Sequence, residues 1–318
     1  MEIQGLVQEI IEGRRLIRGD DLSFFRTISL KDLCRGADNI REELCGNSID
    51  LCSIINGKGG RCSEDCKFCS QSSHFHTDAK EYSLLHRQEI LADCKKHADK
   101  KVHRYSIVTA GRDLNEKELK EVCLAYKMMH EECKIDLCAS HGILSDQALL
   151  ALKENGVSMY HQNIETSIRN FNNICTTHSY EDKISVIRGA QKIGLRVCSG
   201  GIIGMGETFQ DRLDMAISLA ELEVQSIPIN VLMPIKGTPF ELLEPLTEDE
   251  ILRTIAIFRF INPTASIRLA AGRSLMKDSG KSAFRAGANA TITGDLLTTS
   301  GHNISEDKEM IVQMGFDI

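Results

Sequence analysis

The spacing of apolar residues changes once along this chain, near residue 48. Before that point apolar residues recur every three or four positions, as in Ile3, Leu6, Val7 and Ile10, which is the spacing of an amphipathic helix. Two shorter helical patterns follow, LSFF and LKDLC. Residues 1–46 are therefore predicted to form a helical extension that precedes the main fold.

After residue 48, short β-branched runs alternate with amphipathic helical stretches such as KELKEVCLAYKMMHEE and YEDKISVIRGAQKIG. The last run is followed by a final helical stretch, SEDKEMIVQMG. Eight strand–helix units in sequence predict an α/β fold, a complete (β/α)8 TIM barrel. No linker interrupts the pattern, so residues 1–318 are predicted to form a single domain that includes the extension. The predicted strands are IDLCSII, HRYSIVT, KIDLCAS, VSMYHQ, LRVCSG, IPINVLM, SIRLAA and ANATIT.

Several polar and sulfur-containing residues fall in or just after these predicted strands. In a TIM barrel the C-terminal ends of the strands carry the active site. We therefore expect one convergent site, which would collect Cys52, Ser106, Cys138, Asn163, Glu165, Cys198, Asn230 and Arg268.

Composition narrows the class of protein. The 318 residues are close to the size of one such barrel, and an apolar fraction of 42% can fill a large core. The net charge of −7 argues against nucleic acid or an anionic membrane as a partner. No apolar run reaches the roughly 18 residues of a spanning helix, and the first residues lack the apolar core of a signal peptide. We therefore expect a cytoplasmic protein, in which twelve cysteines indicate metal chemistry rather than disulfides.

The most informative stretch is CSEDCKFC, in which Cys62, Cys66 and Cys69 have the spacing C-x3-C-x2-C. Three thiolates so close together can hold three irons of a [4Fe-4S] cluster, which ordinarily takes four cysteines. One iron is then open to a small molecule, as in catalytic metal sites. Half of a zinc knuckle is the alternative, but no second ligand pair follows.

Four stretches together carry a family resemblance: CSEDCKFCSQS, VCSGGIIGMGET, SIPINVLMPIKGTP and IRLAAGR. Over nearly its whole length the chain resembles the biotin synthase family of the radical S-adenosylmethionine (SAM) superfamily. The resemblance implies that SAM binds the open iron and is cleaved to a 5′-deoxyadenosyl radical. That radical would abstract hydrogen from dethiobiotin, and sulfur from an auxiliary iron–sulfur cluster would close the ring of biotin. A reducing electron donor and a homodimer are implied as well.

The resemblance also assigns ligand contacts. For SAM it implies Phe68 against the adenine, the backbone at Thr109, Ala110 and Gly111 near the amino group, and Ile202 as a further contact. Glu165 replaces the usual Asp at the ribose, and Lys183 replaces the usual Arg near the carboxylate, where a solvated helix face is the alternative. For dethiobiotin it implies Asn163 and Asn230 at the ureido ring, and Thr298 and Thr299 at the carboxylate, where a helix cap is the alternative.

The chain departs from the family pattern at the auxiliary cluster. Cys138, Cys198 and Arg268 match three of the four usual ligands, but Ser106 stands where the remaining cysteine is expected. Serine is a poor substitute for a soft thiolate. Cys52 lies on the first predicted strand instead, so we hypothesise that it is the replacement ligand. The cluster would then be a four-iron cluster with an extra sulfide, resembling the form in strict anaerobes, rather than the usual [2Fe-2S]. The alternative is that Cys52 is a packed apolar residue and the second cluster is absent.

The other cysteines have no ligand pattern. Core packing is the default for Cys94, Cys123 and Cys133, whereas Cys175, after the fourth strand, could approach the site. Cys34 and Cys45 lie in the helical extension. Two alternative functions stay open: a related radical enzyme of the methylornithine synthase or hydrogenase-maturation type, and a non-catalytic iron–sulfur or zinc protein.

Overall fold

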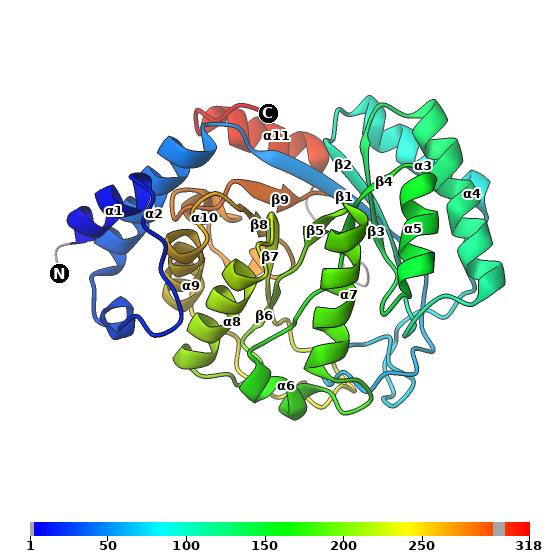
Figure 1. Cartoon of the computed structure of the whole chain (residues 1–318), viewed down its shortest axis with the longest axis horizontal. Helices are drawn as coiled ribbons and strands as arrows, with labels where there is room; N and C mark the ends of the chain where they lie inside the picture. Colours follow the sequence, from blue (N-terminus) through cyan, green and yellow to red (C-terminus); the bar gives the residue numbers. More distant parts are fainter. Residues whose placement is uncertain (1–2, 295–302) are drawn as a thin grey trace.

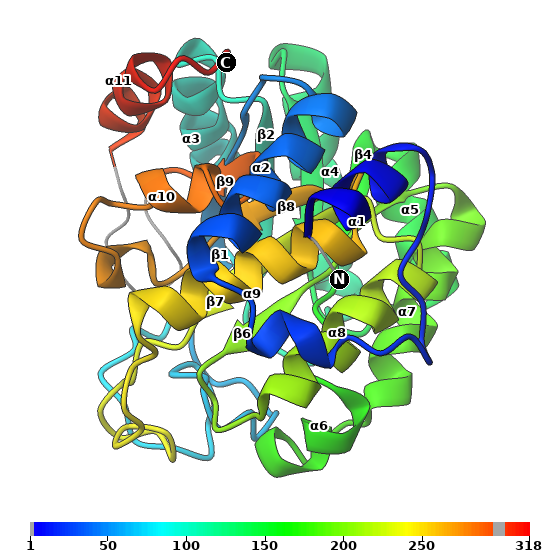
Figure 2. The same ribbon diagram turned by 90° about the vertical axis from the view of Figure 1, so that its left-hand side faces the viewer.

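The computed structural model describes residues 3–294 and 303–318. Its helical extension comprises α1 (Ile3–Ile11), the short 3-10 helix η1 (Ser23–Arg26) and α2 (Leu30–Cys45), so the predicted helical character of this region is confirmed. Helix α2 begins where the LKDLC pattern begins, directly after its N-cap residue Ser29. It continues beyond that pattern to Cys45. Helix α2 packs against α9 on the outside of the barrel, as Figure 2 shows.

The rest of the described chain is a closed parallel barrel with helices around it, which confirms the predicted (β/α)8 fold (Figure 1). The pairing order is β5-β4-β3-β2-β1-β9-β8-β7-β6, and a β5–β7 pairing closes the ring. The strands are β1 (Asp50–Lys58), β2 (Arg104–Thr109), β3 (Asp136–Ser140), β4 (Val157–His161), β5 (Arg196–Cys198), β6 (Gly201–Ile203), β7 (Ser226–Val231), β8 (Ser266–Leu269) and β9 (Ala290–Ile292). The remaining helices are α3 (Arg87–Asp99), α4 (Glu116–Glu132), α5 (Asp146–Glu154), α6 (Ile168–Ile174), α7 (Tyr180–Ile193), α8 (Phe209–Glu221), α9 (Glu248–Ile261), η2 (Arg273–Leu275), α10 (Lys281–Phe284) and α11 (Ile304–Gln313).

The fifth predicted strand, LRVCSG, is observed as β5, and a further short strand, β6, follows it after Ser199 and Gly200. The register to β7 is the same on both sides of the break, Cys198 opposite Ser226 and Gly201 opposite Ile229. Pro228 lies opposite the break and has no N–H to donate to a ladder, so regular pairing is interrupted there. The backbones also approach closely: a Cβ on Gly200 would lie 1.9 Å from the Pro228 carbonyl oxygen. The break therefore needs glycine at position 200.

Two long loops lie at the end of the barrel to which the strands point. We call the loop after β1, which contains Cys62, Cys66 and Cys69, the cysteine loop. It is drawn in light blue and the loop after β7 in yellow, and both views place the two loops together below the barrel (Figures 1 and 2). They touch, since a Cβ on Gly237 would meet the His76 carbonyl oxygen. Within the described ranges, no helix is long and apolar enough to cross a membrane.

Candidate active site

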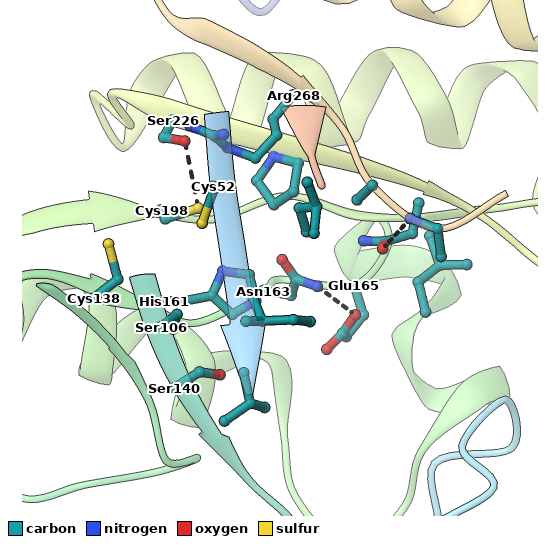
Figure 3. A pocket seen from close by; sticks show the side chains of 18 of the residues that line it. Cys52, Ser106, Cys138, Ser140, His161, Asn163, Glu165, Cys198, Ser226 and Arg268 are labelled. Atoms are coloured by element: carbon teal, nitrogen blue, oxygen red, sulfur yellow. Dashed lines mark hydrogen bonds between the residues drawn. The ribbon is translucent and has the colours of Figure 1, made fainter. Parts of the chain in front are cut away.

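A cavity of about 370 Å³ occupies the centre of the barrel (Figure 3). Eleven of the residues that the sequence singled out line it, contributed by the cysteine loop and by strands all around the ring. The predicted convergence is therefore observed for Cys52, Phe68, Cys69, Ser106, Cys138, Asn163, Glu165, Cys198, Asn230 and Arg268, and Ile202 lines the cavity as well.

Cys52, Cys138 and Cys198 form a group of buried thiols on β1, β3 and β5, and we call it the thiol trio. Each is between 4% and 9% exposed, and the thiols are close enough to influence one another's ionisation. Burial raises the pKa of the Cys52 thiol to about 11, and the nearby Arg268 guanidinium opposes that rise. Figure 3 shows Cys52 and Cys198 directed toward the same part of the cavity. The trio therefore offers three soft donors beside a cation.

Arg268 is held by Asp50, a residue that the sequence reasoning missed. Its guanidinium donates to Asp50 Oδ1 at 2.6 Å and to the backbone oxygens of Asp50 and Thr291. Burial would lower the pKa of Arg268, but the Asp50 carboxylate together with the Cys52 and Cys198 thiols outweighs that effect and raises the pKa above its usual value. Arg104 on β2 also pairs with Asp50, at 3.0 Å, and lines the cavity. The sequence offered one signal for Asp50 and Arg104: each is a charged residue at the start of a β-branched run.

Ser106 lies in the same wall as the thiol trio. It is opposite Cys138 in the β2–β3 register, it is buried, and its hydroxyl oxygen has no hydrogen-bond partner among the described residues. Ser226, which was not predicted, accepts from Cys198 Sγ at 3.5 Å. The structure thus places both the serine and its proposed replacement, Cys52, in one cavity.

The cysteine loop is folded by its own backbone. The Cys62 N–H donates to the Gln71 oxygen at 2.9 Å, and the Ser73 N–H donates to the Cys62 oxygen at 2.8 Å. Burial raises the pKa of the Cys62 thiol, and the nearby backbone N–H groups of Glu64 and Gly111 oppose that rise. Burial raises the pKa of the Cys69 thiol to about 11, and the backbone N–H groups of Gln71 and Ser72 oppose that rise. Such N–H donors favour the thiolate form that binds iron. Cys66 is half-buried and does not line the cavity.

The backbone expected near the SAM amino group follows β2 directly. Ala110 is buried, and its N–H donates to the Lys58 oxygen at 2.8 Å, which ties this segment to the end of β1. The backbone N–H of Gly111 is near enough to the Cys62 thiol to lower its pKa. The segment therefore lies beside the cysteine loop, although Ala110 itself is outside the cavity lining.

Glu165 follows β4 and has a left-handed backbone, with φ of 68°. Its N–H donates to the Gly200 oxygen and its carbonyl accepts from Ile202, so the strained residue is fixed across the β5–β6 break. A Cβ on Gly201 would lie 2.4 Å from the Glu165 oxygen, which requires glycine there. Lys183, on α7, is buried with its Nζ 3.8 Å from Glu165 Oε1, so it does not lie on a solvated helix face.

Both predicted amides face the cavity. Asn163 Oδ1 accepts from the Gly200 N–H at 3.0 Å, and its Nδ2 donates to Glu165 Oε2 at 3.3 Å. Asn230 Nδ2 donates to the Gly201 oxygen and its Oδ1 accepts from the Ala271 N–H, each at 3.2 Å. Each amide has two N–H donors and two acceptor lone pairs, so each retains bonding capacity for a ligand. Thr298 and Thr299 lie outside the described residues.

His141 supports the wall behind this site. It is buried, and its ring contacts Thr109 Oγ1 at 2.9 Å and Tyr126 OH at 3.1 Å. Burial lowers its pKa from 6.5 to about 3. Below pH 6.5 the unfolded chain therefore binds a proton that the folded chain does not. Above pH 6.5 this histidine does not make the free energy of unfolding depend on pH. Below pH 6.5 the free energy of unfolding should fall by about 1.4 kcal/mol for each unit by which the pH is lowered.

We expect His141→Gln to reduce this pH dependence, measured by urea unfolding of the cluster-free chain between pH 7.5 and 5.5. Burial also lowers the pKa of His161, to about 4, so part of the acid sensitivity should remain. His74→Gln is the matched control, since His74 is exposed. An equally steep slope in His141→Gln would show that other groups cause the acid sensitivity.

The two cysteine groups fit iron–sulfur clusters by their chemistry. The cysteine loop presents thiols against backbone N–H groups, and the thiol trio is buried beside a guanidinium that can balance an anionic cluster. Soft thiolates are the donors that such clusters take.

The fold has counterparts among solved structures. Methylornithine synthase aligns with a TM-score of 0.86 over 98% of this chain and 96% of its own, at 20% identity, which establishes a common fold only. The family model described as "Radical SAM superfamily" matches residues 58–219, which include the cysteine loop. Fold and site thus define the class as a radical SAM enzyme.

Sequence relatives narrow the class. The chain is 72% identical to a biotin synthase of Alkaliphilus metalliredigens (strain QYMF) over the full length of both. It is 61% identical to one of Clostridium beijerinckii over 99% of this chain and 100% of the relative. Residues 228–317 match the model described as "Biotin and Thiamin Synthesis associated domain". The chain belongs to the biotin synthase family.

Proposed function

We propose that this chain converts dethiobiotin into biotin by SAM-dependent radical chemistry. One observation carries the proposal: a single cavity is lined both by the cysteine loop and by the thiol trio, with two amides in its wall. A radical generator and a sulfur source would then face the same substrate. When bound, a [4Fe-4S] cluster with SAM supplies the radical, and an auxiliary cluster supplies the sulfur.

Cys62, Cys66 and Cys69 would hold the SAM cluster. The N–H groups against Cys62 and Cys69 support this assignment. SAM would lie between this loop and the ends of β4 and β6, with Phe68, Ala110 and Ile202 along it. Glu165 would accept from the ribose hydroxyls, and Lys183, paired with Glu165, would lie near the SAM carboxylate.

Cys52, Cys138 and Cys198 would hold the auxiliary cluster, which we propose to be a four-iron cluster with an extra sulfide. Three thiols leave one iron of such a cluster available for that sulfide. Arg268 would act beside the cluster as a cation rather than as a ligand, because Asp50 keeps its guanidinium protonated. A protonated guanidinium has no lone pair for iron.

Asn163 and Asn230 would bind the ureido ring of dethiobiotin, because each amide offers both a donor and an acceptor. The assignment of Thr298 and Thr299 to the substrate carboxylate stays a prediction. We also propose a single domain, a homodimer, a reducing electron donor and a cytoplasmic location. Twelve free cysteines suit that reducing compartment.

The decisive experiment is anaerobic reconstitution with iron and sulfide, followed by dithionite, SAM and dethiobiotin. We expect 5′-deoxyadenosine and biotin, both detected by mass spectrometry. Without 5′-deoxyadenosine the radical proposal fails. With 5′-deoxyadenosine but no biotin, the chain would catalyse a different radical reaction.

Glu165→Gln tests the SAM contact. The substitution keeps the side-chain shape but removes the charge that strengthens hydrogen bonds to the ribose. Hydrogen bonds to charged groups contribute about 1.5–3 kcal/mol, so KM for SAM should rise roughly 10- to 100-fold with a smaller change in kcat. Glu154→Gln on α5 is the control, since Glu154 is exposed. An unchanged KM would remove Glu165 from the SAM site.

A further inference from the structure

A second group of potential metal ligands lies beside the cysteine loop. Cys175 follows directly after α6, and its Sγ is 3.8 Å from Cys66 Sγ. Donor atoms of Cys66, Cys175 and His178 all lie within 4.8 Å of one another. Cys175 and His178 are buried, and neither is among the described residues that line the barrel cavity. The proposed reaction gives them no role.

The sulfur–sulfur distance in this group matches a tetrahedral ion. With metal–sulfur bonds of about 2.3 Å and metal–nitrogen bonds of about 2.0–2.1 Å, tetrahedral angles place two sulfurs ~3.8 Å apart and a sulfur and a nitrogen ~3.6 Å apart. Cys66 Sγ and Cys175 Sγ are 3.8 Å apart, as that geometry requires. Cys175 Sγ lies 3.3 Å from His178 Nδ1 and 3.6 Å from Nε2, so the imidazole has to turn to direct one nitrogen at the ion. Two soft sulfurs and an imidazole are donors typical of zinc sites.

Acidic neighbours complete the arrangement. Glu64 Oε2 lies 2.6 Å from His178 Nδ1, which is the carboxylate–histidine contact that orients a ligand through its other ring nitrogen. Asp65 Oδ1 is 3.2 Å from Cys175 Sγ and is held by the N–H groups of Thr176 and Thr177. Asp65 is therefore our candidate for the fourth donor.

We propose that, before the cluster is loaded, Cys66, Cys175, His178 and Asp65 bind one thiophilic divalent cation of the zinc type. Cys66 belongs to this site and to the cysteine loop. Because the same thiolate would be needed by the SAM cluster, the ion and the cluster exclude each other. The site would thus block cluster loading when zinc is in excess. The exclusion step rests on the proposed role of the cysteine loop in holding the SAM cluster and does not depend on the substrate.

Cobalt(II) is the probe, since tetrahedral thiolate-bound cobalt has strong visible absorption. It is titrated anaerobically into the cluster-free full chain, with circular dichroism as a check of folding, and zinc is then added to displace it. Loss of an outer-shell partner of a metal ligand costs about 10–100-fold in affinity, so Cys175→Ser and His178→Ala should weaken binding by more than ~100-fold. Cys69→Ala is the matched control and should retain the absorption.

Unchanged cobalt affinity in both Cys175→Ser and His178→Ala would overturn the proposal. Cobalt held by the thiol trio is distinguished because it would respond to Cys52→Ala instead. A second measurement follows cluster reconstitution after one equivalent of zinc. Zinc should slow the reconstitution of the parent chain several-fold but have little effect on Cys175→Ser. An equal delay in both chains would contradict the exclusion step, whether or not biotin is formed.

Discussion

Replacing Cys62 with alanine is expected to abolish SAM cleavage. Cys62 has two backbone N–H groups against its sulfur, from Glu64 and Gly111, and belongs to the cysteine loop that would hold three irons. Loss of an outer-shell partner already costs about 10–100-fold, so loss of a direct ligand should lower 5′-deoxyadenosine formation by about 100-fold or more. The measurement is 5′-deoxyadenosine per chain after anaerobic reconstitution, together with bound iron.

Cys123→Ala is the matched control, because Cys123 lies on α4 and does not line the cavity. It should retain both iron and SAM cleavage. If Cys62→Ala cleaved SAM at the parent rate, the cysteine loop would not be the radical-generating site.

Replacing Cys52 with alanine is expected to preserve SAM cleavage but to abolish sulfur insertion. The substitution removes one thiol of the trio and leaves the cysteine loop intact, so 5′-deoxyadenosine should still form. Biotin formation should fall by about 100-fold or more, for the same reason as at Cys62. Iron and sulfide analysis with Mössbauer spectra would report the loss of the auxiliary cluster directly.

Ser106→Ala provides the control for Cys52. Both side chains line the cavity, but the Ser106 hydroxyl has no partner among the described residues, so its removal should cost little stability or activity. An auxiliary-cluster signal that persists unchanged in Cys52→Ala would make Cys52 a packed residue rather than a ligand. A signal lost in Ser106→Ala would instead assign the ligand to the serine.

The barrel was predictable because its signals are local. Alternating apolar runs and helical stretches recur along the sequence, and each pattern reflects the side-chain periodicity of one element. The break between β5 and β6 was not predictable in this way. It depends on Pro228 lying opposite Gly200, and these residues meet only through the β5–β7 pairing that closes the ring.

The candidate site was also predictable only where its signals are local or carried by the family resemblance. The cysteine loop is visible from spacing alone, and the family resemblance located the strand-end residues that line the cavity. The partners of those residues were not visible. Asp50 lies 218 positions from Arg268, and Cys175 lies 109 positions from Cys66, so no local pattern connects either pair.

The sequence by itself therefore determined the fold class, the cysteine loop and the residues at the strand ends. Only the tertiary structure decided that Arg268 is held by a carboxylate, that Lys183 is buried next to Glu165, and that Cys175 and His178 lie beside Cys66. The physical reason is that these contacts arise from barrel closure and from the packing of loops at one end. Both bring together side chains whose separation along the chain carries no periodic signal.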